Sequence, residues 1–350
     1  MPAACSPIPS RQLRPVTAMI YADAAQKAPA IADRIAAASR ILILSHINPD
    51  GDAIGSLLGM WHALQALGKT AVPIASSALP SYATWLPGIE HVQIYQPGMA
   101  FPDVDLVIML DTASLPRVGR IYDDHAHALA ALPLVIVDHH VTNEGVGTVN
   151  LIVPAAASTC ELLCALFRAM DLPVSPPLAT CLLLGLMTDT QSFQTSATKP
   201  DSLRVAADLL DLGADHERVV HEVYYALPDS SAVLIGLALS ELRREGPIAW
   251  TTVTQAMMAQ TGAEDEAVDE VVRVMQRIGG VQALAMFKER HDGTTKISLR
   301  SRPPVDVSGL AQFWGGGGHA QASGATLMMA PDRAAREVLP RLRALVAARD

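Results

Sequence analysis

The first half of the chain alternates short apolar runs with longer stretches that mix apolar and polar positions. The run 41–44 is aliphatic and unbroken, as expected for a strand buried on both faces of a parallel sheet. Further runs of this kind lie at 70–74, 104–110 and 133–137. Stretches with the length and spacing of helices lie at 28–39, 53–67 and 178–187. This alternation predicts an α/β fold with a doubly wound, mainly parallel sheet.

The second half of the chain has a pattern of its own. Residues 231–245 read as a helix that Gly246 and Pro247 stop. Three strands are expected at 248–253, 283–288 and 295–300. Two helices are expected at 268–278 and 333–348. The pattern predicts a smaller α/β domain at the C-terminal end, joined to the first domain by linker helices within 200–245.

Polar residues follow the first apolar run at a spacing that suits a metal site. His46, Asp50 and Asp52 stand within seven residues, in a loop that Pro49 and Gly51 interrupt. Open α/β sheets bind ligands at the carboxyl ends of their strands, which is where this loop should lie. The same residues also suit a plain polar turn in which Asp50 or Asp52 caps the following helix. The spacing alone leaves both interpretations open.

Three more polar positions follow later apolar segments. Asp111 directly follows the run 104–110, Asp138, His139 and His140 follow the run 133–137, and Asp189 comes two residues after the helical stretch 178–187. Each aspartate alone could be a strand-end or helix cap, but three adjacent ionisable residues after a buried strand are costly unless paired or metal-bound. Together these positions predict one cluster at one edge of the sheet. Carboxylate and imidazole ligands favour a hard to borderline divalent cation.

Composition narrows the classes of function. With 350 residues, the chain has room for about two domains. Its formal net charge of −9 argues against a protein that grips long nucleic acid by the backbone, although a small anionic substrate remains open. No apolar run approaches the roughly 20 residues of a membrane span, so we expect no membrane partner. The four cysteines form no CxxC pair, which favours a reducing compartment such as the cytoplasm. Residues 1–18 are expected to be a disordered tail without the apolar core of a secretory signal.

Taken together, these motifs resemble those of the DHH family of phosphoesterases. The matching segments, in chain order, are HINPDGD at 46–52, DTASLPRVG at 111–119, DHH at 138–140, GLMTDT at 185–190 and GGGGHAQASG at 315–324. In particular, the chain is similar to the bacterial nanoRNases, which also dephosphorylate 3′-phosphoadenosine 5′-phosphate (pAp). The resemblance implies a DHH domain at 19–199, linker helices at 200–245 and a DHH-associated substrate-binding domain at 246–350. It also implies an active site in the interdomain cleft.

The resemblance implies a pair of metal ions. His46 and Asp50 would hold one ion, Asp52, His139 and Asp189 the other, and Asp111 would bridge the two. Mn²⁺ is the expected ion, with Mg²⁺ or Co²⁺ as alternatives. Four aspartates and two divalent ions give a neutral cluster only when both metals are present. In such sites the ions lie roughly 3.5–4 Å apart and promote in-line attack on phosphorus.

The resemblance also assigns residues to the substrate. Asp138, His140 and Arg117 are the expected catalytic residues, with His140 facing the scissile phosphate. His139 and His140 should not both bind metal, because adjacent residues on extended backbone point in opposite directions. The expected phosphate contacts are Arg300, Ser301, Gly317, Gly318 and His319, with the glycine-rich loop forming an anion nest.

Several of these residues have simpler explanations. Arg117 could be a solvated loop residue, Asn143 a turn residue, and the glycines an ordinary turn. Ser158, Thr159 and Glu161 read as an N-terminal helix cap without chemistry. The chain departs from the family pattern at Gln191 (usually glycine), Ala197 (often asparagine) and Ser323 (alanine). These departures leave the ligand set intact and bear on the choice of nucleotide.

The expected function is Mn²⁺-dependent hydrolysis of short 5′-phosphorylated oligoribonucleotides to mononucleotides, with a second activity on pAp. A pyrophosphatase or a phosphodiesterase of cyclic di-AMP turnover is the alternative within this fold. The alternative that is not an enzyme is a nucleotide-binding regulator without catalytic activity, and the complete set of metal ligands argues against it. The family tends to form homodimers.

Overall fold

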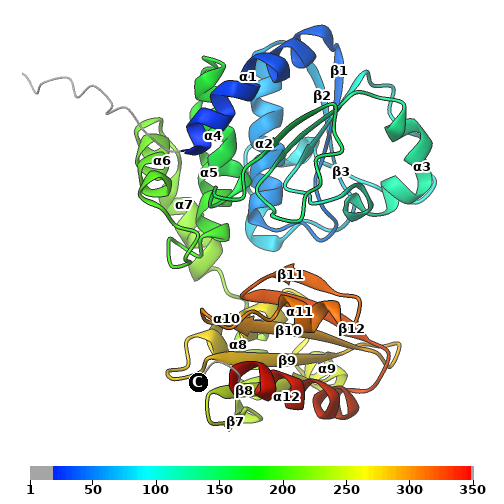
Figure 1. The fold of residues 1–350 in the computed structure, drawn as a ribbon, viewed down its shortest axis with the longest axis vertical. Helices are drawn as coiled ribbons and strands as arrows, with labels where there is room; N and C mark the ends of the chain where they lie inside the picture. The colour runs from blue at the N-terminus through cyan, green and yellow to red at the C-terminus, as the bar shows by residue number, and fades with distance from the viewer. Residues whose placement is uncertain (1–18, 348–350) are drawn as a thin grey trace, which may run out of the picture. The chain divides into compact units, whose positions relative to one another are not determined.

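The chain divides into two compact units, Met1–Ala226 and Leu227–Asp350. The computed structural model describes residues 19–347 (Figure 1). The predicted tail at residues 1–18 therefore lies outside the described residues. Each unit has its own sheet and its own core, and the two are described separately below.

The sheet of the first unit has six strands, all parallel, in the order β3-β2-β1-β4-β5-β6. The strands, in chain order, are β1 (Arg40–Leu44), β2 (Thr70–Ala75), β3 (Gln93–Ile94), β4 (Leu106–Leu110), β5 (Leu134–Asp138) and β6 (Val149–Ile152). Strand order reverses between β1 and β4, which makes their carboxyl ends the topological switch point where ligands bind in open sheets. The predicted α/β fold with a doubly wound sheet is confirmed. Two edge strands, β3 and β6, were not predicted, because β3 has only two residues and Asn150 interrupts the apolar residues of β6.

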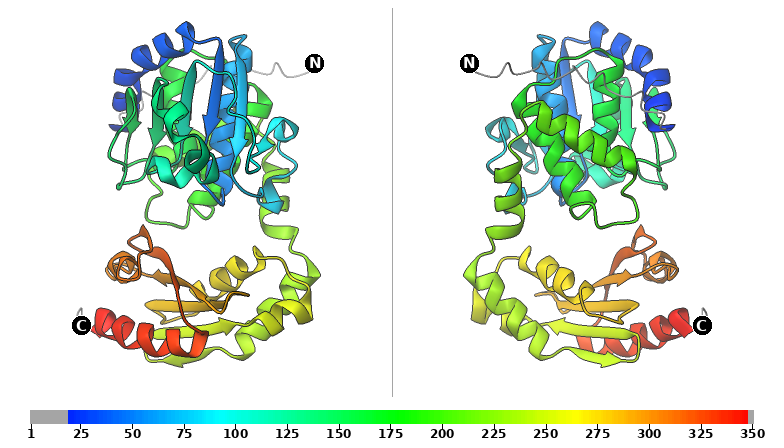
Figure 2. Two further views of the ribbon diagram at one scale, coloured as in Figure 1. Left: turned by 90° about the vertical axis from the view of Figure 1, so that its right-hand side faces the viewer. Right: turned by 90° about the vertical axis from the view of Figure 1, so that its left-hand side faces the viewer.

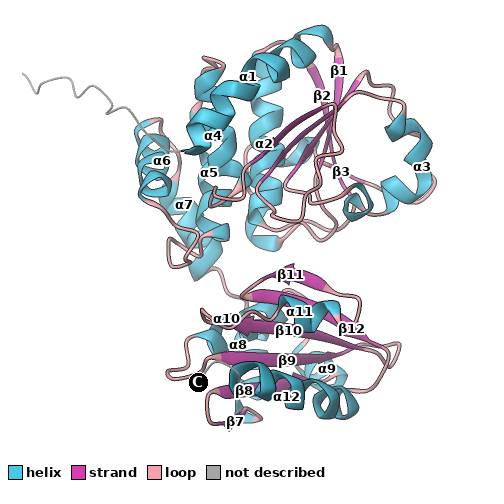
Figure 3. Cartoon of the chain, viewed as in Figure 1, coloured by secondary structure: helices cyan, strands magenta, loops and turns pink. Residues whose placement is uncertain are grey.

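Helices cover both faces of this sheet (Figures 2 and 3). One face packs against α1 (Met19–Ala37), α2 (Gly51–Ala66) and α4 (Thr159–Ala169), and α5 (Pro176–Asp189) packs in turn against α2 and α4. The other face packs against the 3-10 turn η3 (Leu115–Val118) and α3 (Arg120–Ala130). Smaller elements complete the unit: η1 (Ser81–Ala83), η2 (Ile89–His91), α6 (Pro200–Asp211), α7 (His216–Val220) and the π-helical turn η4 (His221–Tyr225).

Helices α2 and α5 approach each other closely along a glycine stripe on α2. An added Cβ at Gly51 would lie 2.3 Å from Thr188 Oγ1, and one at Gly55 would lie 2.5 Å from the Cys181 carbonyl oxygen. At Gly59 it would lie 2.6 Å from the Leu182 side chain. Only glycine allows this spacing. The stripe therefore brings the end of α5 beside the start of α2.

The second unit contains a mixed six-stranded sheet in the order β11-β12-β10-β9-β8-β7. Its strands are β7 (Arg243–Glu245), β8 (Ile248–Val253), β9 (Ala283–Glu289), β10 (Thr295–Ser301), β11 (Gly317–His319) and β12 (Ala322–Leu327). The pair β8–β9 is parallel and the other adjacent pairs are antiparallel. One face packs against α8 (Asp229–Ser240), α9 (Gln255–Thr261) and α10 (Ala267–Gln276). The other packs against α11 (Ser308–Gln312) and α12 (Pro331–Ala347).

Two expectations for this unit were wrong in detail. The helix predicted over 231–245 ends at Ser240, and residues 243–245 form β7 instead. Glu245 pairs with Ile248, so Gly246 and Pro247 make a hairpin turn, with Gly246 at a positive φ of 55°. The glycine-rich segment is not a free loop, because Gly317–His319 pairs with β12 as an edge strand.

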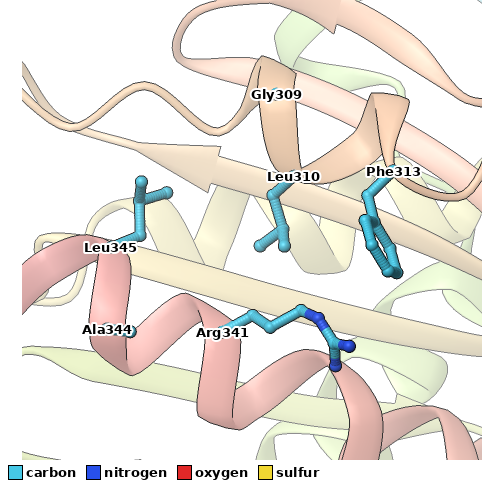
Figure 4. A pocket seen from close by; sticks show the side chains of 6 residues that line it. All are labelled: Gly309, Leu310, Phe313, Arg341, Ala344 and Leu345. Atoms are coloured by element: carbon cyan, nitrogen blue, oxygen red, sulfur yellow. The ribbon is translucent and has the colours of Figure 1, made fainter.

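A pocket of about 380 Å³ lies between α11 and α12 (Figure 4). Arg341 lies over the Phe313 ring, 4.7 Å from its centroid. None of the predicted site residues lines this pocket; its lining consists of Gly309, Leu310, Phe313, Arg341, Ala344 and Leu345.

Among the described residues, no single helix is long and apolar enough to cross a membrane. One pair, His216–Tyr225 with Asp229–Ser240, meets the length and composition requirement together but is bent by 48°.

Candidate metal centre

The six predicted metal ligands come together at the carboxyl edge of the first sheet. His46 follows β1, Asp111 follows β4 and His139 follows β5. Asp50 and Asp52 stand at the start of α2, and Asp189 ends α5. The close packing of α2 on α5 is what adds Asp189 to residues that the strand ends supply.

His46, Asp50 and Asp111 form the first group of possible ligands. His46 Nε2 lies 3.5 Å from Asp111 Oδ2 and 3.9 Å from Asp50 Oδ1. Asp50 also caps α2, because its Oδ1 accepts the backbone N–H groups of Asp52 and Ala53, both at 3.1 Å. The capping role and the proximity to His46 are both present, so neither interpretation of this loop excludes the other.

Asp52, His139 and Asp189 form the second group. His139 Nε2 lies 3.5 Å from Asp189 Oδ2 and 4.0 Å from Asp52 Oδ2. It also lies 3.5 Å from Asp111 Oδ1. Within each group, one donor atom per residue lies within 4.8 Å of the others, a spacing that could hold a metal ion.

Asp111 stands between the two groups. Its Oδ2 faces His46 and its Oδ1 faces His139. The residue is buried and has a positive φ of 51°, an uncommon conformation for a residue other than glycine. Four carboxylates and two imidazoles in this arrangement fit a pair of divalent cations, because each group supplies oxygen and nitrogen donors at the spacing that such ions use.

Without metal, the carboxylates of the cluster titrate differently from one another. Burial and the neighbouring Asp111 raise the pKa of Asp52 to about 7. Burial also raises the pKa of Asp189 well above its ordinary value, although His139 opposes this shift. Burial acts in the same direction on Asp111, but hydrogen bonds from His139 and His46 outweigh it and hold the pKa of Asp111 well below its ordinary value.

The pKa of His46 is also raised. Burial lowers its pKa, yet the hydrogen bond to Asp111 and the charges of Asp50 and Asp111 together raise that pKa to about 9. In the metal-free protein, protonated His46 thus supplies positive charge beside the carboxylates of Asp50 and Asp111.

Asp138 organises the turn that carries the two histidines. Its Oδ1 accepts the backbone N–H groups of His139 (2.8 Å) and His140 (3.2 Å) and the Nδ1 of His140 (2.7 Å). His139 and His140 lie on the same side, and with Asp111 they form a further group of residues that could hold a metal ion. His140 Nδ1 also lies 3.7 Å from Asp111 Oδ1, and the ring centroids of the two histidines are 4.9 Å apart.

Asn143 supports the same turn. Its Nδ2 donates to Asp138 Oδ2 at 2.6 Å and to the Thr112 carbonyl at 3.0 Å, while its Oδ1 accepts the Gly145 N–H. Asn143 therefore has the turn role that the sequence suggested and also contacts the site.

Sequence reasoning missed the contribution of α4. The backbone N–H groups of Thr159 and Cys160 donate to Asp52, at 2.6 and 3.0 Å, and the Thr159 hydroxyl donates to Asp111 Oδ1 at 3.0 Å. Ser158 does cap α4, as predicted, by accepting the Glu161 N–H. The signal that could have pointed to Thr159 is its place directly after a helix cap, where backbone N–H groups attract carboxylates.

Arg117 lies in η3, on a loop that is tied to the His46 loop. The Ile47 N–H donates to the Arg117 carbonyl at 2.7 Å. The Ser76 hydroxyl donates to the neighbouring Val118 carbonyl. The guanidinium is exposed, and no ion pair between it and another described residue is recorded. The backbone of this arginine is therefore fixed beside the cluster while its side chain is accessible.

The turn after Asp189 is left-handed at successive residues. The φ angles are 49° at Gln191, 56° at Ser192 and 65° at Phe193. Glycine adopts such angles without strain, whereas Gln191, Ser192 and Phe193 are not glycines. Here hydrogen bonds hold the turn, including one of 2.7 Å from the Ser192 N–H to the Met187 carbonyl.

The remaining predicted residues lie in the second unit. Arg300 is partly buried and donates to the Leu299 carbonyl at 3.0 Å, and burial lowers its pKa. Ser301 donates its hydroxyl to the Val305 carbonyl at 2.6 Å. Gly317, Gly318 and His319 form the exposed edge strand β11. By register, Arg300 and His319 both pair with Ala322, so they share one face of the sheet.

Comparisons with known proteins agree with this arrangement. The DHH family, N-terminal domain, matches residues 40–186, and the DHHA1 domain matches residues 250–348. The bifunctional oligoribonuclease and PAP phosphatase NrnA of Thermus thermophilus is 32% identical over 287 residues, which is 82% of this chain and 84% of that protein. The cyclic-di-AMP phosphodiesterase PdeA of Listeria monocytogenes is 28% identical over 83% of this chain, which matches 45% of that longer protein.

A solved structure shows the same fold. The crystal structure of an exopolyphosphatase-related protein from Bacteroides fragilis superposes with a TM-score of 0.81 and 27% identity. The match covers 90% of this chain and 95% of that one. Together with the family matches, these similarities show that the chain is an enzyme that belongs to the DHH family of phosphoesterases, with a DHHA1 domain at its C-terminal end.

Proposed function

We propose that this enzyme hydrolyses short 5′-phosphorylated oligoribonucleotides to mononucleotides with Mn²⁺ as cofactor, and that it also removes the 3′-phosphate of pAp. The observation that carries the proposal is the pair of donor groups on either side of Asp111, because two adjacent cation sites suit phosphoester hydrolysis. The relative from Thermus thermophilus, named an oligoribonuclease and PAP phosphatase, supports the choice of substrate.

The proposed ligands follow the two groups. His46, Asp50 and Asp111 would hold one ion, and Asp52, His139, Asp189 and again Asp111 would hold the other. When bound, two such ions supply the Lewis acidity that activates water and the positive charge that stabilises the transition state. The mixture of imidazole and carboxylate donors favours Mn²⁺ over Mg²⁺.

His140 and Arg117 are proposed to act on the phosphate itself. Asp138 binds His140 Nδ1 at 2.7 Å, which orients the ring and leaves proton exchange with the substrate to Nε2. Asp138 is buried, so in this proposal it positions His140 and does not touch the substrate. Arg117, exposed on its fixed loop, would meet charge that develops on the phosphoryl oxygens.

The second unit is proposed to bind the terminal phosphate. Arg300 and His319 supply charge on one face, and the backbone of Gly317 and Gly318 supplies N–H groups. An added Cβ at Gly317 would meet nothing within 4 Å, so the fold does not require glycine there. A ligand that approaches the backbone closely would explain why residue 317 has no side chain. Ser301 is the weakest member of this set, since its hydroxyl already bonds to Val305.

A second candidate function is turnover of cyclic di-AMP or its linear product, which the similarity to PdeA favours. Pyrophosphate hydrolysis is the remaining alternative within the fold. The three are distinguished by rates on linear adenylyl dinucleotide, cyclic di-AMP and pyrophosphate under the same conditions.

Arg300→Ala tests whether the substrate is a nucleotide held by the second unit. Loss of a charge-assisted hydrogen bond of about 1.5–3 kcal/mol should lower kcat/KM for the dinucleotide by about 10-fold or more. Pyrophosphate should be hydrolysed as before. The control is Arg302→Ala, an exposed neighbour that binds the Gln276 carbonyl. Equal losses on dinucleotide and pyrophosphate, or no loss on either, would contradict the proposed role of Arg300.

A further inference from the structure

The first turn of α4 contacts both groups of proposed metal ligands. Thr159 donates its backbone N–H to Asp52 Oδ2 at 2.6 Å and its hydroxyl to Asp111 Oδ1 at 3.0 Å. Cys160 donates its N–H to Asp52 Oδ1 at 3.0 Å. Thr159 is fully buried, so water does not compete for these bonds. A single residue thus bonds to one carboxylate of the second group and to Asp111, which stands between the two groups.

The same turn is held rigidly by its own side chains. Glu161 Oε2 accepts the Ala157 N–H at 2.6 Å, and the Glu161 N–H donates to Ser158 Oγ at 2.9 Å. The Ala156 carbonyl, next to Ala157, lies 3.3 Å from His139 Nδ1. Because the turn meets Asp52, Asp111 and His139, its position decides the direction of three proposed ligands.

The hydroxyl of Thr159 matters most at Asp111. A carboxylate that bridged two cations through both of its oxygens would present one oxygen to each, and here Oδ2 faces His46 while Oδ1 faces His139. A carboxylate oxygen has two lone pairs, so Oδ1 can accept the Thr159 hydrogen bond and still bind a cation. The hydrogen bond fixes the carboxylate against rotation about its Cβ–Cγ bond.

We propose that Thr159 is a positioning residue that holds Asp111 and Asp52 in the geometry required by two metal ions, without touching substrate. The inference rests on the ligand set of the proposed function. It predicts that the hydroxyl sets the affinity of the metal pair, since partners of metal ligands typically change affinity by about 10- to 100-fold. A residue that served only to begin α4 would leave metal affinity unchanged when its hydroxyl is removed.

Thr159→Val removes the hydroxyl and keeps the shape and the backbone N–H. Thr159→Ser keeps the hydroxyl and removes the methyl group. The matched control is Thr180→Val, another buried threonine, whose hydroxyl bonds to the backbone of Pro176 and Asp215. Full-length proteins are stripped of metal, checked for folding by circular dichroism, and titrated with Mn²⁺ by calorimetry.

We expect Thr159→Val to weaken binding of at least one Mn²⁺ by about 10- to 100-fold. The electron paramagnetic resonance signal of a spin-coupled Mn²⁺ pair should be lost at metal concentrations that saturate the wild type. Thr159→Ser should retain both properties within about threefold, and Thr180→Val should match the wild type, because a hydroxyl bonded only to backbone lies outside the ligand shell. If Thr159→Val does not fold, Thr159→Ala receives the same titration, since alanine is accepted at the start of a helix.

Wild-type affinity and an unchanged paired signal in a folded Thr159→Val or Thr159→Ala protein would overturn the inference. Neither readout requires substrate. A wild type that binds two Mn²⁺ ions but cleaves no nucleotide would refute the proposed function and leave the role of Thr159 standing.

Discussion

His46 must change its protonation state when a metal binds. In the metal-free protein its pKa is raised from 6.5 to about 9. A raised pKa means that the contribution of this proton to stability is full below pH 6.5 and is lost as the pH rises through about 9. A metal ion must displace the same proton, because only neutral imidazole is a ligand.

Binding of Mn²⁺ should therefore release protons at neutral pH, and the apparent affinity should rise from pH 6.5 to pH 8. Calorimetry in buffers of different ionisation enthalpy measures the protons released. His46→Gln should release fewer protons than the wild type. Binding without proton release at pH 7 would show that His46 is not a ligand.

At the scale of residues, one rule predicted from the sequence that several of the proposed ligands lie together. Residues at the carboxyl ends of parallel strands meet at one edge, and this rule brought His46, Asp111 and His139 together. The contact of Thr159 with Asp52 was beyond such reasoning, because it joins a backbone N–H to a side chain 107 residues away in the chain. That His139 and His140 lie close together could not be predicted from the sequence either, since it depends on the turn that Asp138 holds.

At the scale of elements, the packing of α2 on α5 positions Asp189 beside Asp52. Gly55→Ala should lower the free energy of unfolding of the first unit by about 1–3 kcal/mol, because the new methyl group would lie 2.5 Å from the Cys181 carbonyl oxygen. Mn²⁺ affinity should fall with it. The control, Gly236→Ala in α8, adds a methyl group in open space and should stabilise the protein slightly. Urea unfolding checks both, and a Gly55→Ala protein as stable as the wild type would refute the account of this contact.

The edge strand β11 allows a second comparison of glycines. Gly317→Ala should leave the melting temperature unchanged, since the space around it is open, but should raise KM for the dinucleotide by obstructing the phosphate. Gly316→Ala should lower the melting temperature, because its Cβ would lie 2.1 Å from the Gly324 carbonyl oxygen. An unchanged KM in Gly317→Ala would show that Gly317 in this strand does not contact the substrate.

Elements with unbroken apolar runs could be predicted from the sequence, and β1, β4, β5 and β9 lie close to their expected bounds. Elements defined by pairing could not. The three residues of β7 are charged, and β11 is nearly all glycine, so neither carries a strand pattern of its own. Both become strands because a neighbouring strand supplies backbone hydrogen bonds, which no local pattern reports.

At the scale of the whole molecule, the proposed metal ligands all belong to the first unit. Mn²⁺ should therefore stabilise the first unit and leave the unfolding of the second nearly unchanged. At a concentration about 100 times the dissociation constant, the gain is about 2.7 kcal/mol. For a domain of this size it corresponds to a rise of about 5–10 °C in melting temperature. Calorimetric scans in EDTA and in Mn²⁺ measure the effect, and identical scans would be incompatible with the site.

The central claim is that the cluster around Asp111 hydrolyses a phosphodiester of a short nucleotide. Its most direct test is chromatography of the products from a 5′-phosphorylated adenylyl dinucleotide incubated with Mn²⁺ and the full-length protein, beside an Asp111→Ala control. The account predicts adenosine monophosphate with the wild type and none with Asp111→Ala. No product from a folded, metal-loaded wild type, or equal product from both proteins, would contradict it.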